Sequence, residues 1–182
     1  LVFKKTGKVN KIVLLGDVKH EFGHFLKQER SDIAKLIDYM EYNTEEIIIV
    51  RGNHDINIDL LIKKDKIKIY DYYKYENICF FHGDRDFKEI HDKKIDTWII
   101  GHVHPAVYLS DGIKSEKYKC FLIGEYEKKK VIIVPSFVEN SEGSDPREDY
   151  VNLAWKFNTN KFDVFVIDEK LDVLNFGKLG KL

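Results

Sequence analysis

The sequence predicts an α/β fold, in which strands and helices alternate along the chain. Short apolar runs rich in β-branched residues end abruptly in glycine and polar residues, as buried parallel strands do. A segment with helical spacing separates the first two of these runs. From residue 106 onward, apolar and polar residues alternate in runs joined by short turns, which is typical of hairpins.

The N-terminal quarter supplies the order strand, helix, strand. Residues 11–15 form an apolar run that stops at a Gly-Asp pair, and residues 47–50 form a β-branched run too short for a helix. Between them, residues 29–42 are a predicted helix, with Ser31 and Asp32 as candidate caps. Its apolar residues recur every three or four positions: Ile33, Leu36, Ile37 and Met40.

The later elements follow the same periodicities. Short helices are expected at 57–64 and 87–93, and strands at 66–70, 75–81, 97–100, 107–110, 117–123, 131–135, 162–167 and 171–174. Residues 139–150 are rich in Asn, Ser, Gly and Asp, and are predicted to form a long polar loop. Loops of this length near a site are often functional.

Length and composition indicate one globular domain over residues 1–182. The chain is 43% hydrophobic and 13% aromatic, which excludes a disordered protein. Its net charge of −1 excludes a broad basic surface, so any nucleic-acid contact must be local. Cys79 and Cys120 lie in apolar runs and are expected to be buried and unpaired. With no apolar segment of membrane-spanning length and no signal-peptide pattern, we expect a cytoplasmic protein.

Four strand ends carry residue types that bind metals, and five of the seven histidines lie in or beside them. Strands that end at one edge of a sheet would bring these side chains together. The sequence therefore predicts a metal site. The four segments are Gly16-Asp17, Gly52-Asn53-His54-Asp55, His82-Gly83-Asp84 and Gly101-His102-Val103-His104.

This set of ligand types suits hydrolysis of a phosphate ester by two divalent metals ~3.5–4 Å apart. Such a pair needs a bridging carboxylate, and Asp17 is the candidate because it follows a glycine at a strand end. The alternative is a turn or capping aspartate. Asn53 offers a neutral oxygen to a hard ion. In this hypothesis His54 faces the phosphate and protonates the leaving oxygen, and Asp55 orients its imidazole; a plain Gly-Asn turn is the alternative.

Three further histidines complete the predicted ligand set. His82 ends an aromatic-rich strand, where the alternative is a packed core histidine. His102 and His104 have i, i+2 spacing, so on a strand they share one face and can bind two adjacent ions. The alternative is a pair of unrelated surface histidines. His20 and Glu21 are either substrate or supporting residues, or exposed turn residues, and neither is predicted as a ligand.

In order and spacing, these segments resemble the calcineurin-like metallophosphoesterases. The resemblance implies a two-sheet sandwich flanked by helices, a four-layer αββα fold. It also implies that Asp17 bridges two metals, that Asn53, His82 and His102 complete the second metal, that His104 binds the first, and that His54 is catalytic. Three strings resemble an archaeal branch related to double-strand-break repair nucleases: residues 15–23, residues 116–121 and Gly143-Ser144-Asp145.

One departure from the family pattern concerns the N-terminus. The family begins with Asp-x-His at the end of a first strand, and no such motif precedes Asp17. Because the first residue is Leu1 rather than methionine, we expect the chain to begin inside a longer gene product. Otherwise, half of the first metal site and the strand that carries it are lost. In either case the sequence as given keeps only Asp17 and His104 for the first metal, and the Asp17 strand has an exposed edge.

The resemblance implies a phosphoesterase that hydrolyses monoesters or diesters through a metal-bridging hydroxide. Manganese is the expected metal, with iron, zinc, nickel and magnesium as alternatives, because mixed nitrogen and oxygen ligands suit several ions. A nucleotide or a nucleic-acid end is a candidate substrate; no membrane partner is expected, and the oligomeric state stays open. Two rival hypotheses are a non-catalytic fragment or subunit that binds at most one metal, and a repair-type nuclease subunit acting with an ATPase partner.

Overall fold

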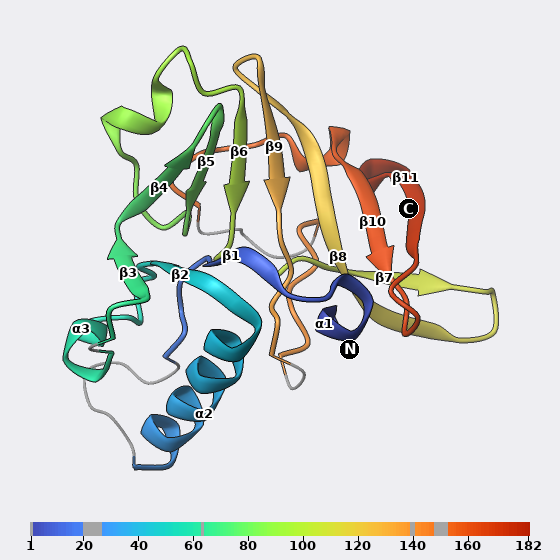
Figure 1. Ribbon diagram of the computed structural model, residues 1–182. Coiled ribbons are helices and arrows are strands. Elements are labelled where there is room, and N and C mark those ends of the chain that lie inside the picture. Colours follow the sequence, from blue (N-terminus) through green and yellow to red (C-terminus); the bar gives the residue numbers. More distant parts are fainter. Residues whose placement is uncertain (1, 20–26, 63, 139–140, 148–152) are drawn as a thin grey trace. The chain divides into compact units, whose positions relative to one another are not determined.

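The computed structural model describes residues 2–19, 27–62, 64–138, 141–147 and 153–182 (Figure 1). The chain divides into two compact units, and each has a sheet of its own. The first unit comprises Leu1–Tyr73 and Phe80–His82, and the second comprises Lys74–Cys79 and Gly83–Leu182. The expectation that the whole chain acts as one domain stays a prediction.

The first unit contains a three-stranded parallel sheet in the order β1-β2-β3. Its strands are β1 (Val9–Leu14), β2 (Thr44–Val50) and β3 (Ile67–Tyr70), preceded by the short helix α1 (Val2–Thr6). Residues 47–50 of the central strand are fully buried, as expected for a strand covered on both faces. Among the described residues, β1 pairs with β2 alone.

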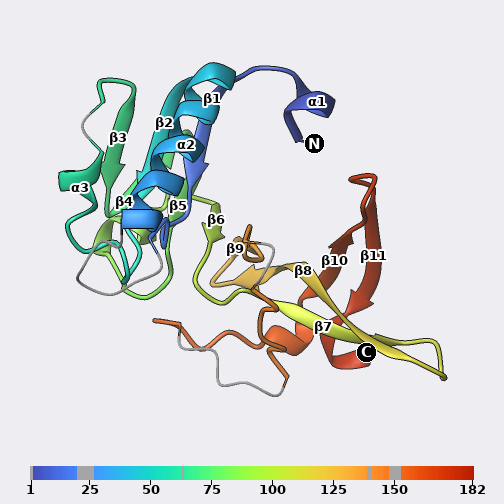
Figure 2. The same cartoon turned by 90° about the horizontal axis from the view of Figure 1, so that it is seen from below.

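Helix α2 (Lys27–Asn43) packs against this sheet (Figure 2). Its apolar stripe and the adjoining residues form one core cluster: Ile33, Ile37 and Met40 of α2, Ile47 and Ile49 of β2, and Ile58 of α3 (Ile58–Leu61). Burying each such side chain stabilises the fold by about 1.5–3 kcal/mol. The helix begins at Lys27, so the prediction that Ser31 and Asp32 cap it is wrong. Both residues lie in its second turn, and Asp32 accepts hydrogen bonds from Gln28 instead.

The second unit contains a mixed sheet in the order β11-β10-β8-β9-β6, which continues through β5 to β4. β6 and β9 are parallel, whereas β8 is antiparallel to β9, β10 and β7, and β10 is antiparallel to β11. The β7–β8 pair extends as a two-stranded arm (Figure 2). The bounds are β6 (Thr97–Ile100), β7 (Ala106–Ser110), β8 (Ser115–Tyr126), β9 (Lys129–Ile133), β10 (Asp163–Ile167) and β11 (Val173–Lys178).

The predicted single strand at 75–81 is wrong, because a turn divides it. The observed strands are β4 (Tyr72–Tyr75) and β5 (Ile78–Phe81). Between them Glu76 adopts φ +53°, and the Asn77 carbonyl accepts hydrogen bonds from the N–H groups of Asp96 and Thr97. These long-range bonds hold a turn that local propensity does not indicate.

Helix is scarce in the second unit. Where a helix was expected at 87–93, the chain forms the 3₁₀ turn η1 (Lys88–His91), and the other helical turns are η2 (Thr159–Lys161) and η3 (Leu179–Lys181). The described residues of this unit contain no α-helix. The fold is thus α/β with one parallel and one mixed sheet, and the four-layer arrangement stays a prediction. No helix in the described ranges is both long and apolar enough to cross a membrane.

Candidate metal centre

Three predicted ligands come together in the first unit. Asp17 lies in the loop after β1, Asn53 in the loop after β2, and His82 directly after β5. His82 Nε2 lies 3.2 Å from Asp17 Oδ2 and 3.2 Å from Asn53 Oδ1. Ligands bound to one ion at about 2.0–2.2 Å are about 3 Å apart, so these atoms have the spacing of a shared coordination shell.

The protonation of His82 makes this convergence informative. The ring is 2% exposed, and its Nδ1 lies 2.7 Å from the carbonyl oxygen of Leu15. Nδ1 donates to that carbonyl, as the supporting bond of a metal-binding histidine does. Nε2 faces two oxygen acceptors, Asp17 Oδ2 and Asn53 Oδ1. A cation is therefore needed between these atoms: either a proton on Nε2, which makes the ring cationic, or a metal ion in its place.

Two glycines let the ligand loops approach closely. A Cβ at Gly16 would lie 2.5 Å from His82 Nδ1 and 2.7 Å from the Gly52 nitrogen. A Cβ at Gly52 would lie 2.1 Å from Asp17 Oδ1. Such contacts are shorter than side chains tolerate. The glycine before each ligand segment is therefore required by packing between the loops.

Asp17 is held in an uncommon backbone conformation, with φ +51°. Its Oδ1 accepts a hydrogen bond of 3.0 Å from the backbone N–H of His54. Burial raises the pKa of Asp17, but interactions with His82 and the His54 N–H outweigh it and hold the pKa below its ordinary value. The carboxylate is therefore ionised at neutral pH, as a metal ligand must be.

Asp55 contacts the backbone of both loops. Its side chain is 1% exposed. Oδ1 accepts the Lys19 N–H at 3.1 Å, and Oδ2 accepts the Gly52 N–H at 2.9 Å. Burial raises the pKa of Asp55, whereas bonds from the backbone N–H groups lower it, and the net change is upward. The prediction that Asp55 orients the His54 imidazole stays a prediction.

The second unit holds His102 and His104 in a turn rather than on a strand. Strand β6 ends at Ile100, and both histidines have left-handed backbones, with φ +64° and +49°. The Val103 N–H donates to the Gly101 carbonyl at 2.7 Å. The expectation that strand alternation places both rings on one face is therefore wrong. Their relative placement is set by the turn, which i, i+2 spacing does not reveal.

Part of the predicted polar loop holds this turn. The Ser144 N–H donates to the His104 carbonyl at 2.9 Å, and the Ser144 carbonyl accepts the Ala106 N–H at 2.9 Å. Asp145, 1% exposed, pairs with Arg147 through bonds of 3.0 and 2.6 Å. Gly143 is required here, because a Cβ would lie 2.4 Å from the His104 oxygen. The Gly-Ser-Asp segment thus supports the His104 backbone.

His102 also packs against the residue that follows His82. A Cβ added to Gly83 would lie 3.6 Å from the His102 Cβ and 2.6 Å from Ile100 Cγ2. Gly83 has φ +117°, a conformation that favours glycine. His102 and Gly83 therefore lie side by side within the second unit.

Comparison with known proteins gives the family. The sequence profile of the calcineurin-like phosphoesterases matches residues 2–170. The chain belongs to the calcineurin-like phosphoesterase family. This is a family of metal-dependent phosphoesterases, which agrees with the ligand types that converge in the first unit. A comparison with curated proteins found no match.

One solved structure supports the metallophosphoesterase-like fold. The crystal structure of nuclease MPE from Pseudomonas putida has a TM-score of 0.56 and 19% identity, covering 91% of this chain and 70% of that chain. Two Vps29 mutants from Entamoeba histolytica are also similar. The single mutant has a TM-score of 0.38 and 13% identity, covering 94% of this chain and 85% of that one. The double mutant has a TM-score of 0.41 and 14% identity, covering 97% and 89%.

Some of the predicted features lie outside the described residues, and one buried residue has no signal in the sequence. His20, Glu21 and residues 139–140 and 148–150 of the polar loop fall outside them. No sequence pattern marks Lys19, yet its side chain is fully buried and its backbone N–H donates a hydrogen bond to Asp55. A lysine at this position resembles any surface lysine in sequence, so only the packing reveals it.

Proposed function

We propose that this chain is a divalent-metal-dependent phosphoesterase whose metal centre is built on Asp17, Asn53 and His82. One observation carries the proposal: in the first unit, His82 Nε2 lies 3.2 Å from an oxygen of each of the other two residues. Mixed nitrogen and oxygen ligands suit manganese, with iron, zinc, nickel and magnesium as alternatives. Family membership supplies the reaction class.

The second unit would supply the remaining ligands. We propose that His102 would help Asp17, Asn53 and His82 to hold one ion, and that His104 would help Asp17 to hold a second. The packing of His102 against Gly83 supports this, since Gly83 is bonded to His82. The turn that carries both histidines is held by backbone bonds, which suits ligands that must stay in place.

The chain's own residues would act on the substrate as follows. Bound divalent ions supply a water-derived nucleophile at neutral pH and stabilise charge on the phosphate oxygens. His54 protonates the leaving oxygen, and its backbone N–H keeps Asp17 in place. The carboxylate of Asp17 stays ionised because its pKa is low. The four-layer fold, the relation to repair nucleases and a cytoplasmic location are proposed with this function.

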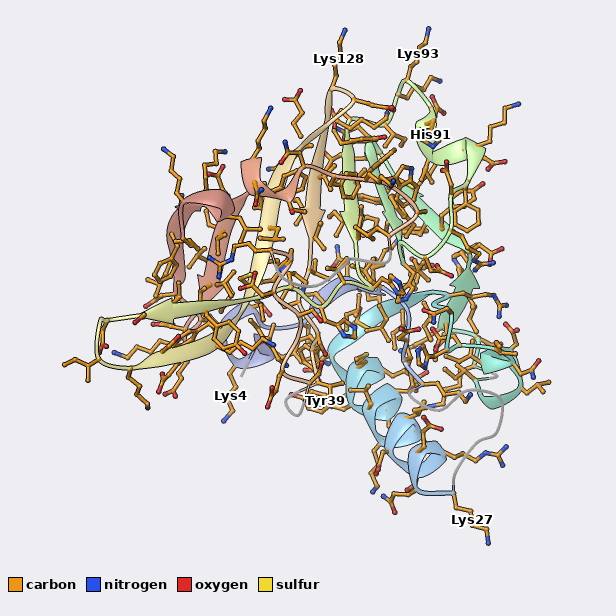
Figure 3. The ribbon with its side chains drawn as sticks, turned by 180° about the vertical axis from the view of Figure 1, so that it is seen from behind. Lys4, Lys27, Tyr39, His91, Lys93 and Lys128 are labelled. Carbon is orange, nitrogen blue, oxygen red and sulfur yellow. The ribbon has the colours of Figure 1, made fainter. Side chains whose placement is uncertain are left out.

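The test is a calorimetric titration of the chain with Mn²⁺, followed by hydrolysis of bis(p-nitrophenyl) phosphate and of a short DNA duplex. His54→Asn should lower turnover by about 10²–10⁴-fold and leave Mn²⁺ affinity unchanged. His91→Asn is the control, because His91 lies on the outside of the second unit and pairs with Asp86 (Figure 3).

Each outcome has a separate meaning. Two bound ions with turnover support the phosphoesterase, and cleavage of DNA would extend it to the nuclease alternative. One ion without turnover would support the rival hypothesis of a non-catalytic, single-metal protein. Equal losses of affinity and turnover in His54→Asn would contradict the role of His54 as the proton donor.

A further inference from the structure

Asp55 lies where the two ligand-bearing loops of the first unit meet. One oxygen accepts the N–H of Lys19, from the loop that carries Asp17. The other accepts the N–H of Gly52, three residues earlier in the loop that carries both Asn53 and Asp55 itself. With 1% exposure, the side chain has little access to solvent, so these bonds are its main polar environment.

A second bond joins the same loops in the opposite direction. The His54 N–H, in the Asn53 loop, donates to the carboxylate of Asp17 at 3.0 Å. Each loop therefore gives one carboxylate to a backbone N–H of the other. Bonds to an ionised acceptor are about twice as strong as neutral ones, and buried bonds are protected from water. The two loops are cross-linked by this reciprocal pair.

The cross-link can fix the positions of the proposed metal ligands, because these residues are next to the residues that form its bonds. Asp17 is two residues from Lys19, and Asn53 lies between Gly52 and His54. Gly16 and Gly52 permit the loops to touch, but an absence of side chains cannot by itself hold them together. The left-handed φ of +51° at Asp17 also needs surrounding bonds to maintain it.

We propose that Asp55 is a positioning residue that sets the separation of Asp17 and Asn53, and thereby the affinity of the centre for its metal. This inference rests on the proposed function and assigns Asp55 a role besides the predicted orientation of His54. Partners that orient metal ligands by hydrogen bonds typically change metal affinity about 10–100-fold when replaced.

The test compares Asp55→Asn with Asp59→Asn in the full chain. Asp55→Asn keeps the side-chain volume but turns one acceptor into an NH₂ group facing a backbone N–H. Asp59, an exposed residue on α3 of the same unit, accepts a hydrogen bond of 2.6 Å from the Arg51 guanidinium and is the matched control. We expect Asp55→Asn to raise the Mn²⁺ Kd about 10–100-fold and Asp59→Asn to leave it unchanged.

Hydrogen exchange in metal-free protein gives the second readout. The amides of Lys19 and Gly52 should exchange faster in Asp55→Asn, whereas Asp59→Asn should leave them unchanged. An unchanged Kd, or unchanged exchange at both amides, would overturn the proposal. If the unaltered chain binds no Mn²⁺, the proposed function fails, and the exchange data still decide whether Asp55 ties the loops.

If Asp55→Asn does not fold, hydrogen exchange in the unaltered chain still tests the proposal. If Asp55 holds both loops, the amides of Lys19 and Gly52 should open together and show equal free energies of exchange. Clearly different values would mean that the two loops open independently, which would contradict the cross-link.

Discussion

The candidate ligand residues are held in place differently in the two units: in the first by side-chain bonds between loops, and in the second by backbone bonds around the turn that carries His102 and His104. Around Asp17 and Asn53, each of two side-chain carboxylates accepts a hydrogen bond from a backbone N–H of the other loop. Around His102 and His104, both of which have left-handed backbones, the hydrogen bonds join backbone groups to each other, including those of Ser144. The arrangement of the loops depends on charged side chains, whereas the arrangement of the turn depends on backbone conformation. They should therefore respond differently to mutation and to pH.

The largest stability loss is expected at the turn, from Gly143→Ala. This substitution combines a φ of +75° with a contact of 2.4 Å to the His104 oxygen. Together they should cost about 2–4 kcal/mol in the free energy of unfolding, measured by urea denaturation. Gly112→Ala is the control in the same unit, because its φ is +89° but no atom lies within 4 Å. Equal losses would mean that contact with His104 is unimportant.

In the first unit, His82→Asn should act on metal binding more than on folding. Loss of Nε2 removes a ligand, and the Mn²⁺ Kd should rise at least about 100-fold, equivalent to about 2.7 kcal/mol. Calorimetry measures this change, and thermal unfolding of the metal-free protein reports stability separately. An unaltered Kd would remove His82 from the proposed ligand set.

Gly52→Ala separates close approach of the loops from general backbone strain. The added Cβ would meet Asp17 Oδ1 at 2.1 Å, so we expect a loss of about 1–3 kcal/mol together with weaker Mn²⁺ binding. Gly7→Ala, with φ +72° and no atom within 4 Å, should lower stability without affecting the metal. Weaker binding in both variants would contradict a local effect at Asp17.

The smallest effect is expected at Asp145 and depends on pH. Burial raises the pKa of Asp145, but the hydrogen bonds and charge of Arg147 outweigh it, and the pKa is lowered. Stability from this group is thus present above the ordinary Asp pKa of about 3.9 and is lost as pH falls through the lowered value. Asp145→Asn should cost about 1–2 kcal/mol at pH 7 and less at pH 3. A pH-independent difference would contradict the ion pair's role.

Periodicity and strand-end chemistry predicted much of the first unit. The β-branched run at 47–50 became the buried centre of β2, and the spacing of Ile33, Ile37 and Met40 became the buried face of α2. Asp17, Asn53 and His82 converge as predicted ligand types should, because the loops and strand that carry them share one compact unit. Buried, unpaired Cys79 and Cys120 are likewise confirmed.

The sequence alone determined the residue types of the candidate centre, the strands that precede them and the family to which the chain belongs. Only the tertiary structure decided how they are held: the Glu76 turn, the left-handed His102 and His104, and the bond from Lys19 to Asp55 in the other loop. The physical reason is the separation along the chain of the residues that interact. Side-chain periodicity is a local property of strands and helices. The Lys19 N–H that binds Asp55, and the N–H groups that hold the Glu76 turn, come from residues far away in the sequence.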